Sequence, residues 1–242
     1  SIVNPPERCY PYDNITIRSP YMISDILNIK RGLTSIIGSG GKTSLMYALA
    51  EELSAESRVI VCTTVKIYAP EHIITLYDPS EEEIKRSLYK NGLICVGKAA
   101  ENGKLILPDI DFSEILKYAD YILCEADGSR GLPLKAHEVY EPVIPKESVE
   151  TIQVMGVKGI GGKIKNVCHR AELYAELTGL NTEYTVTPQI AAKVINAENL
   201  CHKLVINQVE NETDIINASE TAKYINVPVF AGEIRKGRLK CL

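Results

Sequence analysis

The sequence predicts a doubly wound α/β fold built on a mostly parallel sheet. Short apolar runs alternate with amphipathic stretches along the chain after residue 20. The apolar runs are rich in β-branched residues and lack polar alternation, which is typical of strands buried on both faces. Strands that alternate with helices pair in parallel through right-handed crossovers. Residues 21–242 are therefore expected to form a single domain. Residues 1–20, which contain four prolines, are expected to form an irregular arm.

Seven runs are predicted as strands because each is a short apolar block. In chain order they cover 33–37, 58–62, 93–96, 121–124, 151–155, 204–206 and 227–231. An inserted β-hairpin is expected over 98–107, because Asn102-Gly103 at its middle is a strong signal for a tight turn. The segment 127–145 is rich in glycine and proline and is predicted to be a long functional loop.

Five helices are predicted between these strands. They cover 43–55, 81–90, 171–178, a stretch beginning at Pro188, and 219–225. The first places Leu45, Leu49 and Leu53 on one stripe. Ser80 is a cap for the second, Gly179 ends the third, and Pro188 fits the first position of the fourth.

Composition excludes several classes of function. The chain has 27 basic and 31 acidic residues, so it lacks the basic excess that general nucleic-acid binding requires. No stretch reaches the roughly 20 apolar residues needed to span a bilayer. Seven widely spaced cysteines without a C-x-x-C pair are typical of a reducing compartment. We therefore expect a cytoplasmic protein that binds neither nucleic acid nor membrane. The short basic run at 235–238 is expected to be a solvated tail.

A glycine-rich loop lies between the first predicted strand and the first predicted helix. It reads Gly38-Ser39-Gly40-Gly41-Lys42-Thr43-Ser44. Glycines let backbone N–H groups approach phosphate oxygens closely, and the N-terminus of the following helix favours an anion. Lys42 is expected to reach the β- and γ-phosphates of a nucleotide, and the Thr43 hydroxyl to bind Mg²⁺. This context predicts a fold of the P-loop NTPase type.

The loop departs from the common pattern G-x-x-x-x-G-K-[ST] at its start. The first glycine would fall at position 36, which is Ile36. The match is to a shorter form, G-[ST]-x-G-K-[TS], which resembles the loop of Mur-type ligases as much as that of ordinary P-loop NTPases. A small-molecule kinase or an ATP-dependent ligase therefore stays open beside an NTPase.

A second motif places two carboxylates at the end of a predicted strand. The apolar run at 121–124 continues into Glu125-Ala126-Asp127-Gly128. Strand ends of a parallel sheet meet at the edge that holds the phosphate loop, so Glu125 and Asp127 are candidates for binding Mg²⁺ or orienting a water. Downstream, Arg130 and Lys135 are candidates for stabilising charge on a transferred phosphoryl group or for binding an anionic substrate.

Two weaker features are expected at the same edge. Thr63, Thr64 and Lys66 follow the predicted strand at 58–62, where they can contact the γ-phosphate or a metal-bound water. Asn207 begins the run Asn207-Gln208-Val209-Glu210, which loosely matches the N-K-x-D signature for guanine. Because Gln and Glu replace Lys and Asp in that signature, ATP is favoured over GTP. Asn207 stays a candidate contact to the base.

The four histidines show no spacing typical of metal ligands. His72, His137 and His202 are expected to be structural or exposed. His169-Arg170 opens the predicted helix at 171–178, where the histidine can cap the helix and the arginine can bind an anion.

Taken together, these motifs resemble the YqeC-type family, described as accessory proteins of selenium-dependent molybdenum hydroxylases. The motifs are Ile37-Gly38-Ser39-Gly40-Gly41-Lys42-Thr43-Ser44, Cys62-Thr63-Thr64-Val65-Lys66, the block from Glu125 to Ala136, Glu141-Pro142-Val143-Ile144-Pro145 and His169-Arg170-Ala171-Glu172. They span roughly residues 33 to 235. The block at 125–135, E-A-D-G-S-x-G-x-P-L-K, is the most specific. The chain departs from the family pattern at Val65, where a threonine is expected, and at Ala171, where a proline is expected.

The resemblance implies a role in maturing such a hydroxylase or its cofactor, with the hydroxylase or a cofactor precursor as partner. The residues themselves support three hypotheses. The first is a Mg²⁺-dependent NTPase that drives a step for a partner. The second is a kinase or ATP-dependent ligase that acts on a small molecule. The third is a scaffold that binds nucleotide without hydrolysing it.

Overall fold

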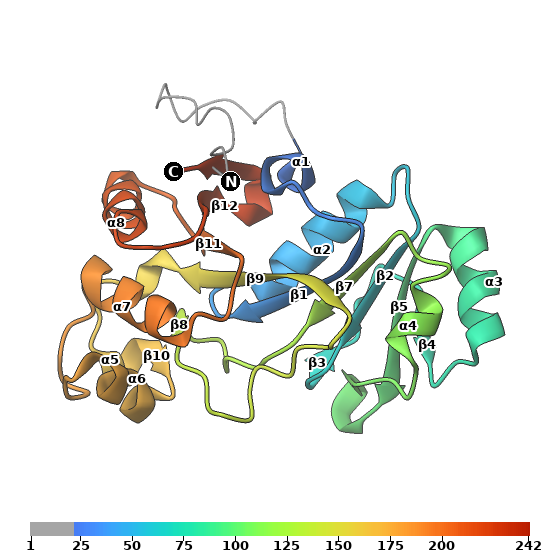
Figure 1. The fold of residues 1–242 in the computed structure, drawn as a ribbon, viewed down its shortest axis with the longest axis horizontal. Helices are drawn as coiled ribbons and strands as arrows, with labels where there is room; N and C mark the ends of the chain where they lie inside the picture. Colours follow the sequence, from blue (N-terminus) through green and yellow to red (C-terminus); the bar gives the residue numbers. More distant parts are fainter. Residues whose placement is uncertain (1–21) are drawn as a thin grey trace, which may run out of the picture.

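The computed structural model describes residues 22–242, so the predicted arm over residues 1–20 lies outside the described residues. One large sheet runs through the molecule (Figure 1). Its strands are β1 (Gly32–Gly38), β2 (Val59–Thr63), β3 (Ile67–Tyr68), β4 (Thr75–Tyr77), β5 (Leu93–Ala99), β6 (Lys104–Ile106), β7 (Tyr121–Glu125), β9 (Ser148–Gly156), β11 (Lys203–Asn207), β12 (Val229–Glu233) and β13 (Arg238–Cys241). A separate pair joins β8 (Leu134–Lys135) and β10 (Cys168–His169).

The central strands of the large sheet are parallel. The spatial order is β13-β12-β11-β9-β1-β7-β2-β5-β6-β3, with β4 paired to β5. All neighbours from β12 to β5 pair in parallel, which confirms the predicted doubly wound α/β fold. All seven predicted strands are present, each shifted or extended by at most a few residues. Parallel pairing brings the C-terminal ends of β1 and β7 to one edge.

Helices pack on both faces of the sheet. They are α1 (Ile23–Leu27), α2 (Lys42–Leu53), α3 (Glu81–Asn91), α4 (Phe112–Ile115), α5 (Ile164–Val167), α6 (Ala171–Thr178), α7 (Pro188–Glu198) and α8 (Glu212–Ala222), with 3₁₀ turns η1 (Glu101–Gly103), η2 (Val157–Gly159) and η3 (Ile234–Lys236). Ser80 caps α3 with a complete capping box, and Thr187 caps α7. No helix within residues 22–242 has the length and apolar character needed to cross a bilayer.

Alternate residues of the central strands face two different cores. Ile36, Val61 and Leu123 pack with α1 and α2 on one face. Ile60 and Cys124 pack with α3 and α4 on the opposite face. A further cluster packs α5 to α8 against β9, β11 and β12. Burial on both faces explains why the strands read as unbroken apolar runs.

Three predicted features differ in detail. The hairpin at 98–107 is formed by β5 and β6, with η1 at its turn, but it continues the large sheet and is extended by β3. The last long helix begins at Glu212, not at 219, because Asn211 caps it with Asp214 in a capping box. The basic run at 235–238 is not a free tail. It spans η3 and the start of β13, the antiparallel edge strand.

Candidate functional site

The phosphate loop runs from the end of β1 to the start of α2, as predicted. Gly38 and Gly40 have φ of 92° and 74°, which side-chain-bearing residues rarely adopt. A Cβ on Gly38 would lie 2.3 Å from the Val154 carbonyl oxygen, and one on Gly40 would lie 2.3 Å from the Gly156 nitrogen. The loop therefore passes so close to β9 that only glycine fits at these two positions. The Ser39 hydroxyl donates to the Pro133 carbonyl at 2.8 Å, which fixes the loop from the other side.

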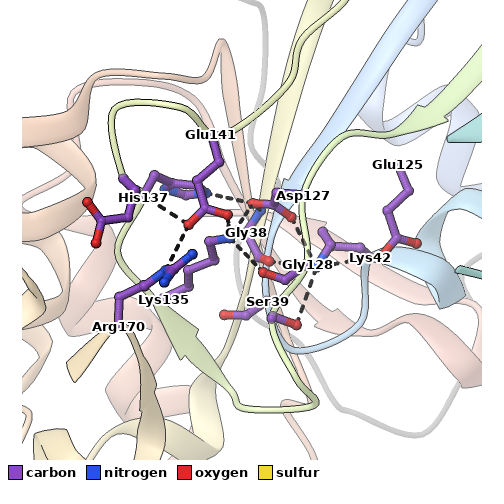
Figure 2. A network of polar contacts seen from close by, with 12 residues as sticks. Gly38, Ser39, Lys42, Glu125, Asp127, Gly128, Lys135, His137, Glu141 and Arg170 are labelled. Atoms are coloured by element: carbon purple, nitrogen blue, oxygen red, sulfur yellow. Dashed lines mark hydrogen bonds and ion pairs between the residues drawn. The ribbon is translucent and has the colours of Figure 1, made fainter. Parts of the chain in front are cut away.

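Lys42 is the first residue of α2, and its ammonium is buried at the centre of the site (Figure 2). The Nζ atom donates to the Gly38 carbonyl at 2.7 Å and to the Ser129 hydroxyl at 3.3 Å. It lies 3.1 Å from Asp127 Oδ1 and 3.7 Å from Glu125 Oε1. The sequence therefore predicted correctly that this lysine and the two carboxylates meet.

Glu125 ends β7 beside the phosphate loop, because β7 pairs with β1 in the register Ile36↔Glu125. The Thr43 hydroxyl donates to Glu125 Oε2 at 2.7 Å. Burial raises the pKa of the Glu125 carboxyl, and the charge of Lys42 and the hydrogen bond from Thr43 oppose that shift only in part. A hydroxyl beside a carboxylate is the hard oxygen donor set that Mg²⁺ prefers, and Mg²⁺ commonly takes one carboxylate together with phosphate oxygens. Thr43 and Glu125 therefore fit the predicted metal site.

Asp127 has different surroundings from Glu125, although both were predicted as metal ligands. Its carboxylate is fully buried and accepts a hydrogen bond from the Gly38 backbone N–H at 2.7 Å. Three basic side chains surround it, with Lys42 at 3.1 Å, Lys135 at 3.5 Å and His137 at 2.6 Å. Burial alone would raise the pKa of Asp127, but the hydrogen bond from His137 and the charges of the two lysines lower it. Asp127 is thus an anion that holds Lys42 and the loop in place.

His137 is a site residue that the sequence analysis expected to be only structural or exposed. Its ring is buried, with Nε2 2.6 Å from Asp127 and Nδ1 2.9 Å from Glu198 at the end of α7. Burial alone would lower the pKa of His137, but the hydrogen bonds to the two carboxylates outweigh that effect and raise it. Each ring nitrogen therefore donates from an imidazolium. Glu198 lies 61 residues away along the chain, so no local pattern could reveal the contact.

The raised pKa of His137 predicts a pH-dependent stability. A group whose pKa is higher in the folded state stabilises fully below its unfolded pKa of about 6.5, and this contribution is lost as pH rises through the folded pKa. The difference in unfolding free energy between the native chain and His137→Gln should therefore be largest near about pH 6 and shrink towards about pH 9. Urea unfolding at both pH values measures it. His72→Gln, on an exposed residue, is the control; a difference that grows with pH would refute the imidazolium assignment.

Two threonines at the C-terminal end of β2, Thr63 and Thr64, are held by the backbone at this edge. The Thr63 hydroxyl is buried and donates to the Glu125 carbonyl at 2.9 Å, while the Thr64 hydroxyl donates to the Val143 carbonyl at 2.8 Å. These bonds place both next to the metal-binding candidates. Lys66 is exposed, and the role predicted for it stays a prediction.

Asn207 lies under the phosphate loop at the end of β11. Its Nδ2 donates to the Gly40 carbonyl at 2.8 Å, and its Oδ1 accepts from the Ile234 backbone N–H at 3.1 Å. Both ends of the side-chain amide are thus used inside the protein. This geometry favours a supporting role for Asn207 over the base contact expected from the sequence.

Asn207→Ala should therefore cost about 1–3 kcal/mol of unfolding free energy, because it leaves the buried Ile234 N–H and the half-buried Gly40 carbonyl without partners. Chemical denaturation measures this loss, with the exposed Asn166→Ala as the matched control. A supporting role also predicts that the ranking of ATP, GTP and CTP affinities is unchanged in the variant. A changed ranking would restore the assignment of Asn207 to the base.

Lys135 lies inside the site, whereas Arg130 lies at its rim. The Lys135 ammonium is buried and donates to the Gly128 carbonyl at 2.6 Å and to Glu141 at 2.9 Å. Arg130 is exposed, with a φ of 51°. Arg170, at the N-terminal end of α6, also contacts Glu141, with its Nε 3.2 Å from the carboxylate. Ser44 lies in the first turn of α2 and is half-buried.

The fold and this site together define a class. The chain is an α/β protein of the P-loop type, with a glycine-rich loop between a central strand and a helix and an acidic residue at the end of the adjacent strand. More narrowly, it belongs to the YqeC family, because residues 34–172 match the family described as YqeC protein. This confirms the resemblance seen in the sequence.

Two known proteins compare with the chain as follows. It is 40% identical to the protein YqeC of Escherichia coli (strain K12) over 162 aligned residues. The aligned part covers 63% of this chain and 62% of that protein. The chain thus matches less than two thirds of that relative's length. Among solved structures, the chloroplast FtsY of Physcomitrella patens superposes with a TM-score of 0.43 and 14% identity, covering 94% of this chain and 67% of that one.

Proposed function

We propose that the chain is a Mg²⁺-dependent nucleotide-binding protein that hydrolyses or transfers the terminal phosphoryl group of a nucleoside triphosphate. The observation that carries this proposal is the contact of the Thr43 hydroxyl with Glu125, 2.7 Å apart, beside the buried Lys42 ammonium. This contact places two oxygen atoms suited to binding Mg²⁺ beside an ammonium suited to binding phosphate, at the start of α2. Mg²⁺, when bound, supplies charge neutralisation on the phosphate oxygens.

The residues have distinct tasks in this proposal. The N–H groups at the start of α2 have no partner within the helix and are suited to binding phosphate oxygens. Lys42 exchanges its contact with Asp127 for a phosphate oxygen, and Asp127 keeps the ammonium in place until then. Thr43 and Glu125 hold the metal. The catalysis expected of such a site is mostly positioning and charge stabilisation.

ATP is the nucleotide that we propose, because the run Asn207-Gln208-Val209-Glu210 lacks the residues that read guanine. The internal hydrogen bonds of Asn207 support this choice, since they occupy its amide. By its family, the chain would use the nucleotide to assist maturation of a selenium-dependent molybdenum hydroxylase or its cofactor. A cytoplasmic location would fit that task.

A small-molecule kinase or ATP-dependent ligase is the second candidate. The segment from Asp127 to Glu141 favours it, because this segment folds beside the phosphate loop and places Lys135 within 3.5 Å of Asp127. A second substrate could therefore lie close to the transferred group. This candidate predicts phosphoryl transfer only when an acceptor is added, whereas an NTPase releases phosphate without one.

The metal-binding assignment has a direct test in Glu125→Gln. The variant keeps the shape of the side chain but loses its charge, so the Mg²⁺ concentration for half-maximal nucleotide binding should rise by at least about tenfold. Calorimetric titration with ATP at several Mg²⁺ concentrations measures it. Glu51→Gln, on the exposed face of α2, is the matched control. An unchanged Mg²⁺ dependence would remove Glu125 from the metal site, and binding without phosphate release under any condition would favour the scaffold hypothesis.

A further inference from the structure

The small sheet of β8 and β10 brings basic residues together beside the phosphate loop. Its parallel register pairs Lys135 with His169. Leu134 and Cys168, the preceding residues of the two strands, are buried in the core with α6 and α7. Because side chains alternate along a strand, Lys135 and His169 face away from that core. This two-stranded sheet is separate from the large one and fixes the two side chains next to each other.

Two arginines flank this pair, and each has a backbone conformation that is uncommon outside glycine. Arg130 has φ of 51° and Arg170 has φ of 62°. Strained residues of this kind occur preferentially at ligand sites. Burial lowers the pKa of His169, and the positive charges of Lys135, Arg170 and Arg130 lower it further. The four residues are called the basic cluster below.

Only part of the positive charge of the basic cluster is neutralised. Figure 2 shows Glu141 between Lys135 and Arg170, and its carboxylate lies 2.9 Å from Lys135 Nζ and 3.2 Å from Arg170 Nε. Arg170 contacts Glu141 through Nε and lies over the Tyr140 ring at 5.6 Å, and its two Nη groups have no hydrogen-bond partner among residues 22–242. Arg130 makes no hydrogen bond or ion pair with any other described residue. Guanidinium groups with unused N–H donors match the two oxygens of a carboxylate or phosphate.

We propose that Arg130, Lys135, His169 and Arg170 form a binding site for the phosphate or carboxylate group of a second, small-molecule ligand. The site shares one carboxylate with the phosphate loop, because Asp127 lies 3.5 Å from Lys135 and 3.1 Å from Lys42. A ligand held there lies beside the terminal phosphate of a nucleotide. The proposal that the basic cluster binds an anion does not depend on nucleotide binding by the loop. Its role as the site of the second substrate rests on the proposed function.

The test is calorimetric titration of the full chain with inorganic phosphate and, separately, with succinate as a carboxylate probe. The protein is first saturated with Mg²⁺ and a non-hydrolysable ATP analogue, so that the phosphate loop is occupied. Arg170→Gln and Arg130→Gln should each weaken anion binding by about tenfold or more. Arg86→Gln, on an exposed residue of α3, should leave it unchanged. The tighter of the two probes identifies the anion class. Arg130 is exposed, so its variant stays informative if Arg170→Gln does not fold.

The outcomes separate this site from the phosphate loop. If phosphate binds only when the ATP analogue is left out, and Lys42→Ala but neither arginine variant weakens that binding, the phosphate loop is the anion site and the basic cluster is not. No saturable binding of phosphate or succinate also overturns the inference. Neither result affects nucleotide binding by the loop. Conversely, if the ATP analogue does not bind but the arginine variants weaken phosphate binding, the anion site stands and the proposed function fails.

Discussion

Replacing Lys42 by alanine is expected to weaken Mg²⁺–nucleotide binding by at least about tenfold and to abolish turnover. The ammonium lies among Gly38, Ser129 and the two carboxylates, at the start of α2, and is the buried cation that a phosphate group would meet. A hydrogen bond to a charged group contributes about 1.5–3 kcal/mol, and about 1.4 kcal/mol is tenfold in affinity. Titration calorimetry gives the affinity, and a phosphate-release assay gives the turnover.

Lys90→Ala is the matched control for this prediction, because Lys90 is exposed on α3. The thermal unfolding of Lys42→Ala should show a cooperative transition, since Asp127 keeps its contacts to His137, Lys135 and the Gly38 N–H. Equal affinity in the native chain and a folded Lys42→Ala variant would contradict the role assigned to Lys42.

Asp127→Ala is expected to lower the unfolding free energy by about 3 kcal/mol or more. The substitution removes a buried carboxylate from Lys42, Lys135 and His137, whose side chains are at most 4% exposed. Removing one partner of a buried ion pair typically costs about 3–5 kcal/mol, because the remaining charges cannot be solvated. The Gly38 N–H also loses its acceptor. Urea denaturation near neutral pH measures the difference.

The same variant has a pH signature. The pKa of Asp127 is lowered in the folded protein, so its stabilising contribution is present above the unfolded value of about 3.9 and is lost as pH falls through the folded pKa. The gap between the native chain and Asp127→Ala should therefore close in acid. Asp109→Ala, on an exposed residue, serves as the reference. A loss below about 1 kcal/mol at neutral pH would show that the network does not depend on Asp127.

The features that were predictable from the sequence are those with local causes. Apolar runs such as 58–62 and 121–124 gave the central strands, because burial on both faces leaves no polar alternation. The glycines of the phosphate loop and the carboxylate at position 125 were predictable because each follows directly from a strand end. The parallel pairing of β1 with β7 then brings the phosphate loop and Glu125 together, and no further sequence pattern is needed to predict their contact.

The features that were missed depend on contacts between distant segments. β8 and β10 have two residues each, too few for a periodic pattern, and form only because the two segments meet. The contact of His137 with Glu198 joins a loop to the end of α7. Asn207 was placed correctly at a strand end, but its support of Gly40 depends on where the loop passes. The start of α8 is a different case, because Asn211 and Asp214 form a capping box that the sequence contains.

Nucleotide binding with Mg²⁺ by the loop at 38–44 is the property on which the proposed function depends. The most direct test is calorimetric titration of the purified chain with ATP, GTP and CTP in the presence of Mg²⁺. We expect saturable binding of one ATP per chain, tighter than that of GTP or CTP. No detectable binding of any of the three would contradict it, and the loop and its buried lysine would then have to serve the fold or another anion.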